Sequence, residues 1–214
     1  MRFTELRIEG YRSLVNVILP LRPLSVMIGP NGSGKTSVLE VFQWLRDATQ
    51  ENLAEAMERL GGLNAVLSRV PNYPARLKIA LEVDVQSERS QEPMCYRFEL
   101  APRDVSYVIP LEQLEWQWDP SAAKPYRYID AHYDNVHYAD PGSPGMVRPT
   151  WDYHRLDLAL AQVTRMYEEP EALRSALART RHFSFLDVGR RSVVRLPQAL
   201  TPTTSPGPNG EKAS

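Results

Sequence analysis

The chain has 214 residues, a formal net charge of −1 and an apolar fraction of 43%, so it is long enough to bury a core and lacks the strongly basic balance of an obligate nucleic-acid binder. Its single cysteine, Cys95, excludes a disulfide framework and a cysteine metal site. Because no apolar run approaches a membrane span and the N-terminus has no signal-peptide core, we expect a cytoplasmic protein with no membrane partner.

Two short strands are predicted at the start of the chain. Residues 3–9 alternate apolar and polar side chains, and residues 14–19 form a second strand. Between them Gly10 permits a turn, which continues as Tyr11-Arg12-Ser13-Leu14. The sequence therefore predicts a hairpin at the N-terminus.

Residues 29–36 read Gly-Pro-Asn-Gly-Ser-Gly-Lys-Thr and fit the phosphate-binding template Gly-x4-Gly-Lys-[Ser/Thr] at every fixed position. The apolar run 24–28 predicts the strand that the template requires before it. A helix is predicted after it, from the spacing of Val38, Leu39, Val41, Phe42 and Leu45. The alternative, a glycine-rich strand-to-helix turn without a ligand, is disfavoured by this context.

The residue types of this loop suit a nucleoside triphosphate. Three glycines allow successive N–H groups to point into one concavity, and the positive end of the helix faces the same anion. Lys35 is predicted to neutralise the β- and γ-phosphates, and the Thr36 hydroxyl to bind Mg²⁺. Asn31 is predicted to brace the loop. The predicted ATP-binding residues are Gly29, Pro30, Asn31, Gly32, Ser33, Gly34, Lys35, Thr36 and Ser37.

The hairpin, its Gly-aromatic-Arg-Ser turn and the segment LSVMIGPNGSGKTSVLEVFQWL together resemble the start of the RecF/SMC-like branch of ABC-type ATPases, often labelled AAA family ATPases. The resemblance implies ATP and Mg²⁺ as cofactors and places Arg12 near the bound nucleotide. A surface arginine that ends a hairpin is the open alternative for Arg12. Members of the family use ATP to bring two heads together, and they often act on DNA in repair, chromosome maintenance or defence. A homodimer and DNA are therefore possible partners by resemblance.

The middle of the chain changes from helix to strand. A helix is predicted over residues 51–60, and the clearest alternation in the chain predicts a strand over 77–85. Further strands are predicted at 96–100, 105–109 and 114–118, which makes an antiparallel meander. A kinase-like P-loop fold would instead alternate helices with parallel strands. The predicted fold class is α/β, a P-loop NTPase of ABC-ATPase type with this meander beside the nucleotide-binding sheet.

Residues 119–153 are rich in Pro, Asp, Tyr and His and are predicted to be mostly loop, with a short strand at 126–129. A metal site is one interpretation of the histidines and aspartates in this region. The spacing fits no template, however, and a solvated loop is favoured. The residues concerned are His132, His137, Asp130, Asp134 and Asp140.

A helical period returns over residues 156–167 and again after Pro170, which suits the first turn of a second helix. A strand is predicted at 183–186. The Pro/Thr/Ser/Gly-rich end is typical of a loop or disordered tail. We therefore divide the chain into residues 1–196, the front half of an ABC-type P-loop ATPase domain, and the tail 197–214.

Two parts of an ATP-hydrolysing site are missing from the sequence. In the family, an apolar strand ending in Asp-Glu holds Mg²⁺ and orients the attacking water, and a Leu-Ser-Gly-Gly signature meets the γ-phosphate across a dimer. The chain contains neither sequence. Asp187 is the candidate for the magnesium aspartate, although Val188 stands in place of the glutamate and a strand-end aspartate without this role is the alternative. Gln198 is a candidate for the glutamine that touches the metal.

Both missing parts normally follow the region that this chain resembles, so the domain is predicted to be incomplete. Truncation, a split ATPase whose second chain supplies the Asp-Glu strand and signature, and a degenerate module are the three explanations, and truncation is favoured. Hydrolysis is expected of the complete domain.

Two other functions compete with an ATPase. One is a module that binds nucleotide without hydrolysing it and serves as an interaction surface, and the other is a P-loop small-molecule phosphotransferase, which the meander disfavours. An arginine-rich patch could meet nucleic-acid phosphates, although a solvated or partner-facing surface is favoured. Its members are Arg179, Arg181, Arg190, Arg191 and Arg195.

Overall fold

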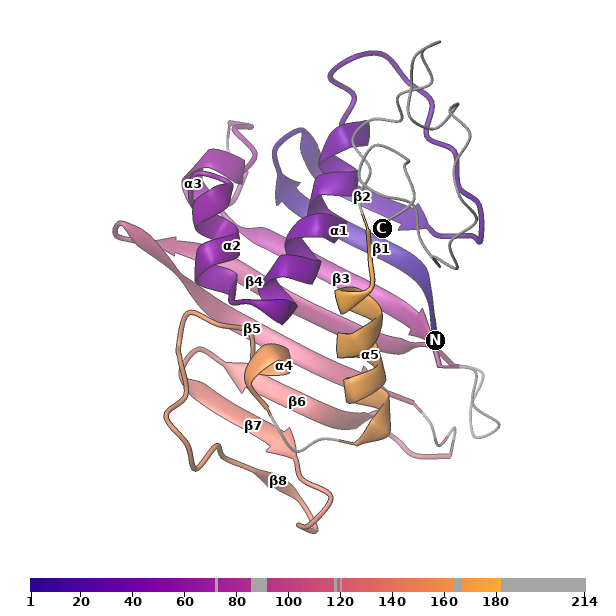
Figure 1. Cartoon of the computed structure of the whole chain (residues 1–214), viewed down its shortest axis with the longest axis vertical. Coiled ribbons are helices and arrows are strands. Elements are labelled where there is room, and N and C mark those ends of the chain that lie inside the picture. The colour runs from indigo at the N-terminus through magenta and orange to yellow at the C-terminus, as the bar shows by residue number, and fades with distance from the viewer. Residues whose placement is uncertain (72, 86–91, 118, 120, 164–166, 182–214) are drawn as a thin grey trace, which may run out of the picture. The chain divides into compact units, whose positions relative to one another are not determined.

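An eight-stranded antiparallel sheet organises the computed structural model, which describes residues 1–71, 73–85, 92–117, 119, 121–163 and 167–181 (Figure 1). The spatial order is β2-β1-β3-β4-β5-β6-β7-β8, so β1 lies between β2 and β3, and from β3 onward each strand pairs with the next. The strands are β1 (Arg2–Tyr11), β2 (Leu14–Pro20), β3 (Leu77–Asp84), β4 (Met94–Arg103), β5 (Ser106–Trp116), β6 (Tyr126–His132), β7 (Asn135–Ala139) and β8 (Met146–Val147).

The helices of the described residues lie over one face of this sheet (Figure 1). They are α1 (Lys35–Gln50), α2 (Leu53–Arg59), α3 (Leu63–Val66), α4 (Ala159–Gln162) and α5 (Glu168–Ala178). The chain divides into two units, Met1–Thr180 and Arg181–Ser214, and the sheet and helices belong to the first. Beyond Arg181 the second unit lies outside the described residues. No described helix is both long and apolar enough to cross a membrane.

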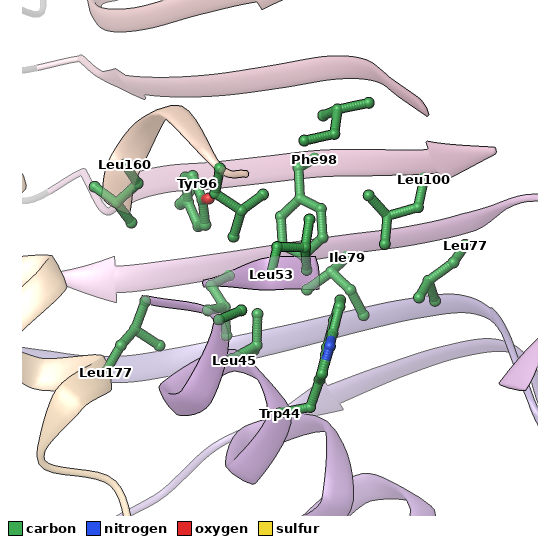
Figure 2. Packing of buried hydrophobic residues seen from close by; sticks show 14 of the residues in the cluster. Trp44, Leu45, Leu53, Leu77, Ile79, Tyr96, Phe98, Leu100, Leu160 and Leu177 are labelled. Atoms are coloured by element: carbon green, nitrogen blue, oxygen red, sulfur yellow. The ribbon is translucent and has the colours of Figure 1, made fainter. Parts of the chain in front are cut away.

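The alternation along β3 determines which face of the sheet is buried. Successive side chains of a strand point to opposite faces, so every second residue meets the helices. In β3 these are the fully buried Leu77, Ile79, Leu81 and Val83, and the residues between them are partly exposed. Figure 2 shows Trp44 and Leu45 of α1 packed over Ile79 and Phe98, and the Trp44 and Phe98 ring centroids are 5.8 Å apart. The predicted α/β class with an antiparallel meander is confirmed.

Two core tryptophans differ in the hydrogen bonding of their indole nitrogens. Trp116 Nε1 donates to the Glu92 carbonyl at 2.8 Å, whereas Trp44 Nε1 is buried without a hydrogen-bond partner in the described part of the chain. Trp44→Phe removes an unsatisfied donor, and Trp116→Phe removes a hydrogen bond. We therefore expect Trp116→Phe to lower the free energy of unfolding by about 1–2 kcal/mol more than Trp44→Phe. Urea unfolding followed by circular dichroism measures both, and equal losses would contradict the assignment.

One strand replaces the two predicted at 105–109 and 114–118. β5 runs continuously from Ser106 to Trp116 in spite of Pro110, which cannot donate a hydrogen bond to a neighbouring strand. The β4–β5 register shifts beside it, since Glu99 pairs with Leu111 but Ala101 pairs with Val108. This bulge gives β5 one extra residue next to the proline, so the ladder continues on both sides.

The strand predicted at 126–129 is present within the longer β6, and the rest of 119–153 is mostly loop as predicted, but β7 and β8 were not predicted. β6 and β7 form a hairpin there, with His132 opposite Asn135 and the two-residue turn Tyr133-Asp134 between them. The turn places Tyr133 at φ +53°, a left-handed conformation that favours glycine or asparagine. Because neither residue stands at that position, the sequence lacked the usual hairpin signal.

The strand predicted at 24–28 is also absent. Leu24, Val26 and Ile28 are 82%, 74% and 93% exposed, and residues 25–30 have no regular structure. A buried strand of a P-loop fold needs neighbours that pair with its backbone and cover its side chains. No strand of the described residues pairs with this segment, so the apolar sequence alone did not suffice.

The predicted helices changed in length. α1 and α5 are confirmed, and Pro170 lies in the first turn of α5. The helix predicted over 51–60 is present as the shorter α2. The helix predicted over 156–167 is reduced to the single turn α4 within the described residues. The strand predicted at 183–186 and the tail 197–214 lie outside the described residues.

Candidate nucleotide-binding site

The glycine-rich loop leads directly into α1. The Ser33 N–H donates to the Pro30 carbonyl at 3.3 Å and closes a turn, and the first helical bond joins the Val38 N–H to the Gly34 carbonyl at 3.1 Å. Gly32 and Gly34 have φ values of +81° and +93°. Because side chains rarely tolerate this conformation, the loop requires glycine at both positions.

The N-terminal end of α1 has no side-chain cap, and its first turn contains no acidic residue. The first backbone N–H groups of an α-helix have no partner within the helix, and the helix dipole adds positive potential at this end. Thr36 is exposed in this first turn. This end of α1 therefore offers hydrogen-bond donors and a hydroxyl to an anion.

Lys35 lies across the loop that precedes it. Its ammonium Nζ donates to the carbonyl oxygens of Gly29 at 2.8 Å and of Pro30 at 2.7 Å. The ammonium group is thereby held against the backbone of the loop. Lys35 and Thr36 are the first two residues of α1, and their contact with a nucleotide stays a prediction.

The β1–β2 turn packs against the same loop. A Cβ atom added to Gly34 would lie 2.6 Å from Leu14 Cδ2 and 3.1 Å from Ser13 Oγ. These distances are shorter than ordinary van der Waals contact, so Gly34 is also required for the close approach of the turn. The turn that contains Arg12 is therefore a neighbour of the phosphate-binding loop, although β2 and residues 21–28 separate the two along the chain.

Arg12 is fixed by its backbone and by its side chain. Its φ is +48°, its N–H donates to the Val66 carbonyl at 2.6 Å, and its carbonyl accepts from the Ser68 hydroxyl at 2.6 Å. Its Nε lies 3.4 Å from Glu40 Oε2, and its guanidinium carbon lies 5.7 Å from the centroid of the Tyr11 ring. Contact between Arg12 and a nucleotide stays a prediction.

Glu40 and Tyr11 were not among the predicted site residues. The Tyr11 hydroxyl donates to Glu40 Oε2 at 3.4 Å, and burial together with the Glu40 charge raises the pKa of Tyr11 to about 12. The helical period contained a usable signal, because Glu40 follows Thr36 by four positions and such residues share one helix face. The tertiary contact with Arg12 had no signal in the sequence.

The histidines and aspartates of residues 130–140 do not converge on one point. No group of three or more His, Cys, Asp or Glu side chains within the described ranges could hold a metal ion. Each residue has a contact of its own: His132 with Asp130 (3.3 Å), His137 with Arg148 (3.2 Å), Asp134 with Arg155 (3.0 Å), and Asp140 with the Gly142 N–H (2.9 Å).

Several predicted residues fall outside the described residues. Asp187 and Gln198, the candidates for magnesium binding, are among them, so the structure does not test either role. Of the arginine-rich patch, Arg179 ends α5 and Arg181 is exposed. The other three members, Arg190, Arg191 and Arg195, lie outside the described residues.

Comparison with known proteins finds similarity to ATPase domains. Residues 1–92 match the model of the AAA ATPase domain family. The chromosome partition protein Smc of Cereibacter sphaeroides is 34% identical over 88 residues, which are 39% of this chain and 7% of that protein. A solved structure from work on the ATP-driven dimerisation and DNA-stimulated activation of SMC ATPases matches 51% of this chain and 68% of its own chain, at 17% identity and a TM-score of 0.39. The region matched by the AAA family contains the phosphate-binding loop, the Arg12 turn and α1.

Proposed function

We propose that this chain, an AAA-type ATPase domain related to the SMC ATPases through its N-terminal region, binds ATP with Mg²⁺ at the loop Gly29–Thr36. The observation that supports the proposal is the loop geometry. Two positive-φ glycines, an uncapped helix start and the Lys35 ammonium are all present within eight residues of sequence. This arrangement matches the charge and the hydrogen-bond acceptors of a triphosphate.

Each group has a distinct role in the proposal. Backbone N–H groups of the loop and of the first turn of α1 bind phosphate oxygens, and Lys35 neutralises charge on the β- and γ-phosphates. The Thr36 hydroxyl would hold Mg²⁺ together with phosphate oxygens and an acidic residue from outside the loop. Mg²⁺ supplies charge stabilisation at the transferring phosphoryl group when it is bound.

Hydrolysis needs an acidic residue beyond this loop, and we assign this role to Asp187 or to a residue of a second chain. The exposed Leu24–Ile28 segment supports this assignment, because its apolar side chains lack covering strands in the described residues. A strand that covers this segment would bring its own end next to the loop, which is where the magnesium aspartate is required. The complete domain then hydrolyses ATP.

The proposal also includes a DNA-related role for the complete protein. The Smc relative is a chromosome partition protein, but the aligned part of this chain covers 7% of it. We therefore propose nucleotide-driven association of two copies in a DNA process as the function of the complete protein. The alternative, a module that binds nucleotide without turnover, is favoured by the missing Asp-Glu strand in this chain.

The test is Mg·ATP binding by titration calorimetry together with single-turnover hydrolysis, on the wild type and on Lys35→Ala. Loss of a charge-assisted contact costs about 1.5–3 kcal/mol, so we expect the Kd of Lys35→Ala to rise by at least about tenfold. Lys78→Ala is the matched control, because Lys78 pairs with Glu9 at 3.1 Å on the opposite face of the sheet. Its Kd should equal that of the wild type.

The outcomes separate the candidate functions. ATP binding that depends on Lys35 without turnover supports a nucleotide-binding module or half of a split ATPase. Turnover that depends on Lys35 supports a complete site within this chain and makes Asp187→Ala the next variant. Equal binding by the wild type and Lys35→Ala would refute the proposed site.

A further inference from the structure

Glu40 is a charged side chain of α1 that contacts the Arg12 turn. Its Oε2 atom accepts the Tyr11 hydroxyl and lies 3.4 Å from Arg12 Nε. The carboxylate is about one-quarter exposed and the arginine 40% exposed. The contact therefore lies at the edge of the core, where a guanidinium can still reach a ligand in solvent.

The position of Glu40 on α1 connects this contact to the nucleotide loop. Thr36 and Glu40 are four residues apart and share one face of the helix, with Cβ atoms about 5–6 Å apart in such pairs. Gly34 approaches Ser13 and Leu14 so closely that an added Cβ atom would overlap Leu14. The Arg12 side chain thus lies about one helical turn from the proposed Mg²⁺ ligand.

The backbone of Arg12 is held in place, so only its side chain is free to change direction. Hydrogen bonds to Val66 and from Ser68 hold the peptide groups on both sides of a residue at φ +48°. A left-handed non-glycine residue persists only where its surroundings hold it. Since the side chain still has several rotatable bonds, its direction depends on Glu40 and on the Tyr11 ring.

We infer that Glu40 is a positioning residue that orients the Arg12 guanidinium toward the phosphates of ATP, an inference that rests on the proposed nucleotide site. The recorded ion pair uses Arg12 Nε, and a guanidinium has four further N–H donors on its two terminal nitrogens. Glu40 can therefore hold one edge of the guanidinium while the terminal nitrogens bind phosphate oxygens. An arginine that is ordered before binding loses less conformational entropy when ATP arrives.

A double-mutant cycle tests this inference. The Kd of a non-hydrolysable ATP analogue with Mg²⁺ is measured for the wild type, Glu40→Ala, Arg12→Ala and the double variant. Ordering one long side chain in advance corresponds to roughly two- to tenfold in Kd. We expect Glu40→Ala to raise the Kd by this factor in the wild-type background, and not to raise it in the Arg12→Ala background.

Two further variants exclude a general effect. Glu40→Gln keeps a hydrogen-bond acceptor and should recover part of the affinity, whereas a purely Coulombic role would leave it no better than Glu40→Ala. Glu58→Ala removes an equal charge from an exposed position on α2 and should leave the Kd unchanged. Thermal unfolding of each variant shows that the compared proteins are folded.

Results that contradict the positioning role of Glu40 can be distinguished from failure of the proposed function. Equal Kd changes in the two backgrounds, or tighter binding by Glu40→Ala, would overturn the positioning role while ATP binding dependent on Lys35 stands. A wild type that does not bind the analogue would overturn the nucleotide site and the inference together.

Discussion

Gly10→Ala is expected to unfold the domain or to lower its free energy of unfolding by about 3–5 kcal/mol, the range of severe core defects. A Cβ atom at Gly10 would lie 2.0 Å from the carbonyl oxygen of Arg76, which is part of the backbone and cannot rotate away. The residue is also at φ +84°. Relief of the overlap requires β1 to move away from the start of β3. Urea unfolding followed by circular dichroism measures the loss.

Gly62→Ala is the matched control for this substitution. Gly62 has φ +86°, and no atom lies within 4 Å of the position that its Cβ would occupy. Only the left-handed conformation is then penalised, at about 1–2 kcal/mol. If both alanine variants lose the same stability, the backbone conformation rather than the Arg76 overlap is the cause.

Glu112→Ala is expected to be the second severe substitution, with a loss of about 3–5 kcal/mol. The buried Glu112 carboxyl accepts the N–H groups of Ala159 at 2.6 Å and Leu160 at 2.9 Å, and the Tyr96 hydroxyl at 2.9 Å. Alanine leaves these three buried donors without a partner, each at about 1–3 kcal/mol before relaxation. The affected segment is the start of α4, so hydrogen exchange of residues 158–163 should rise with the loss of stability.

Glu112 also gives the fold a pH dependence of defined sign. Burial raises the pKa of Glu112 to about 7, against the lowering effect of its hydrogen-bond donors, from an ordinary value of 4.5. The folded state therefore binds a proton more tightly than the unfolded state. The resulting stabilisation is complete below pH 4.5 and is lost as the pH rises through about 7. Its size is about 3 kcal/mol.

Glu112→Gln removes the titrating group and should flatten this part of the stability profile between about pH 5 and 8. Tyr96→Phe is the complementary variant. The Tyr96 hydroxyl lowers the pKa of Glu112, so its removal should raise that pKa further and move the fall in stability to higher pH. An unchanged slope in Glu112→Gln would assign the pH dependence to other groups.

The parts of the fold that the sequence predicted are those determined by local pattern. The alternation of residues 77–85 corresponds to β3 with every second side chain buried, and the helical period after the loop corresponds to α1. The glycine-rich turn that leads into α1 was predicted because its glycines, lysine and threonine stand at fixed spacing. In each case the pattern is visible in neighbouring residues, even though the contacts that bury β3 come from β1 and α1 (Figure 2).

The parts of the fold and of the site that the sequence did not predict depend on contacts between residues distant in sequence. The apolar run 24–28 has strand character but no described strand beside it. Ala159 and Leu160 of α4 are held by Glu112 of β5 rather than by helical bonds alone. The turn at Tyr133 forms without glycine because β6 and β7 pair on both sides of it. Glu40 was not predicted as a site residue, because only the folded chain brings Arg12 to it.

If the proposed site binds ATP, the exposed Leu24–Ile28 segment is expected to make the Kd for ATP depend on protein concentration. Its exposed side chains end immediately before Gly29, and a β-prone apolar stretch in this state favours association with other chains. Association that orders the segment also restrains the first residue of the nucleotide loop, so the two equilibria are linked. Dilution is therefore expected to alter the measured Kd for ATP, and a Kd that stays constant over a range of protein concentrations would contradict this linkage.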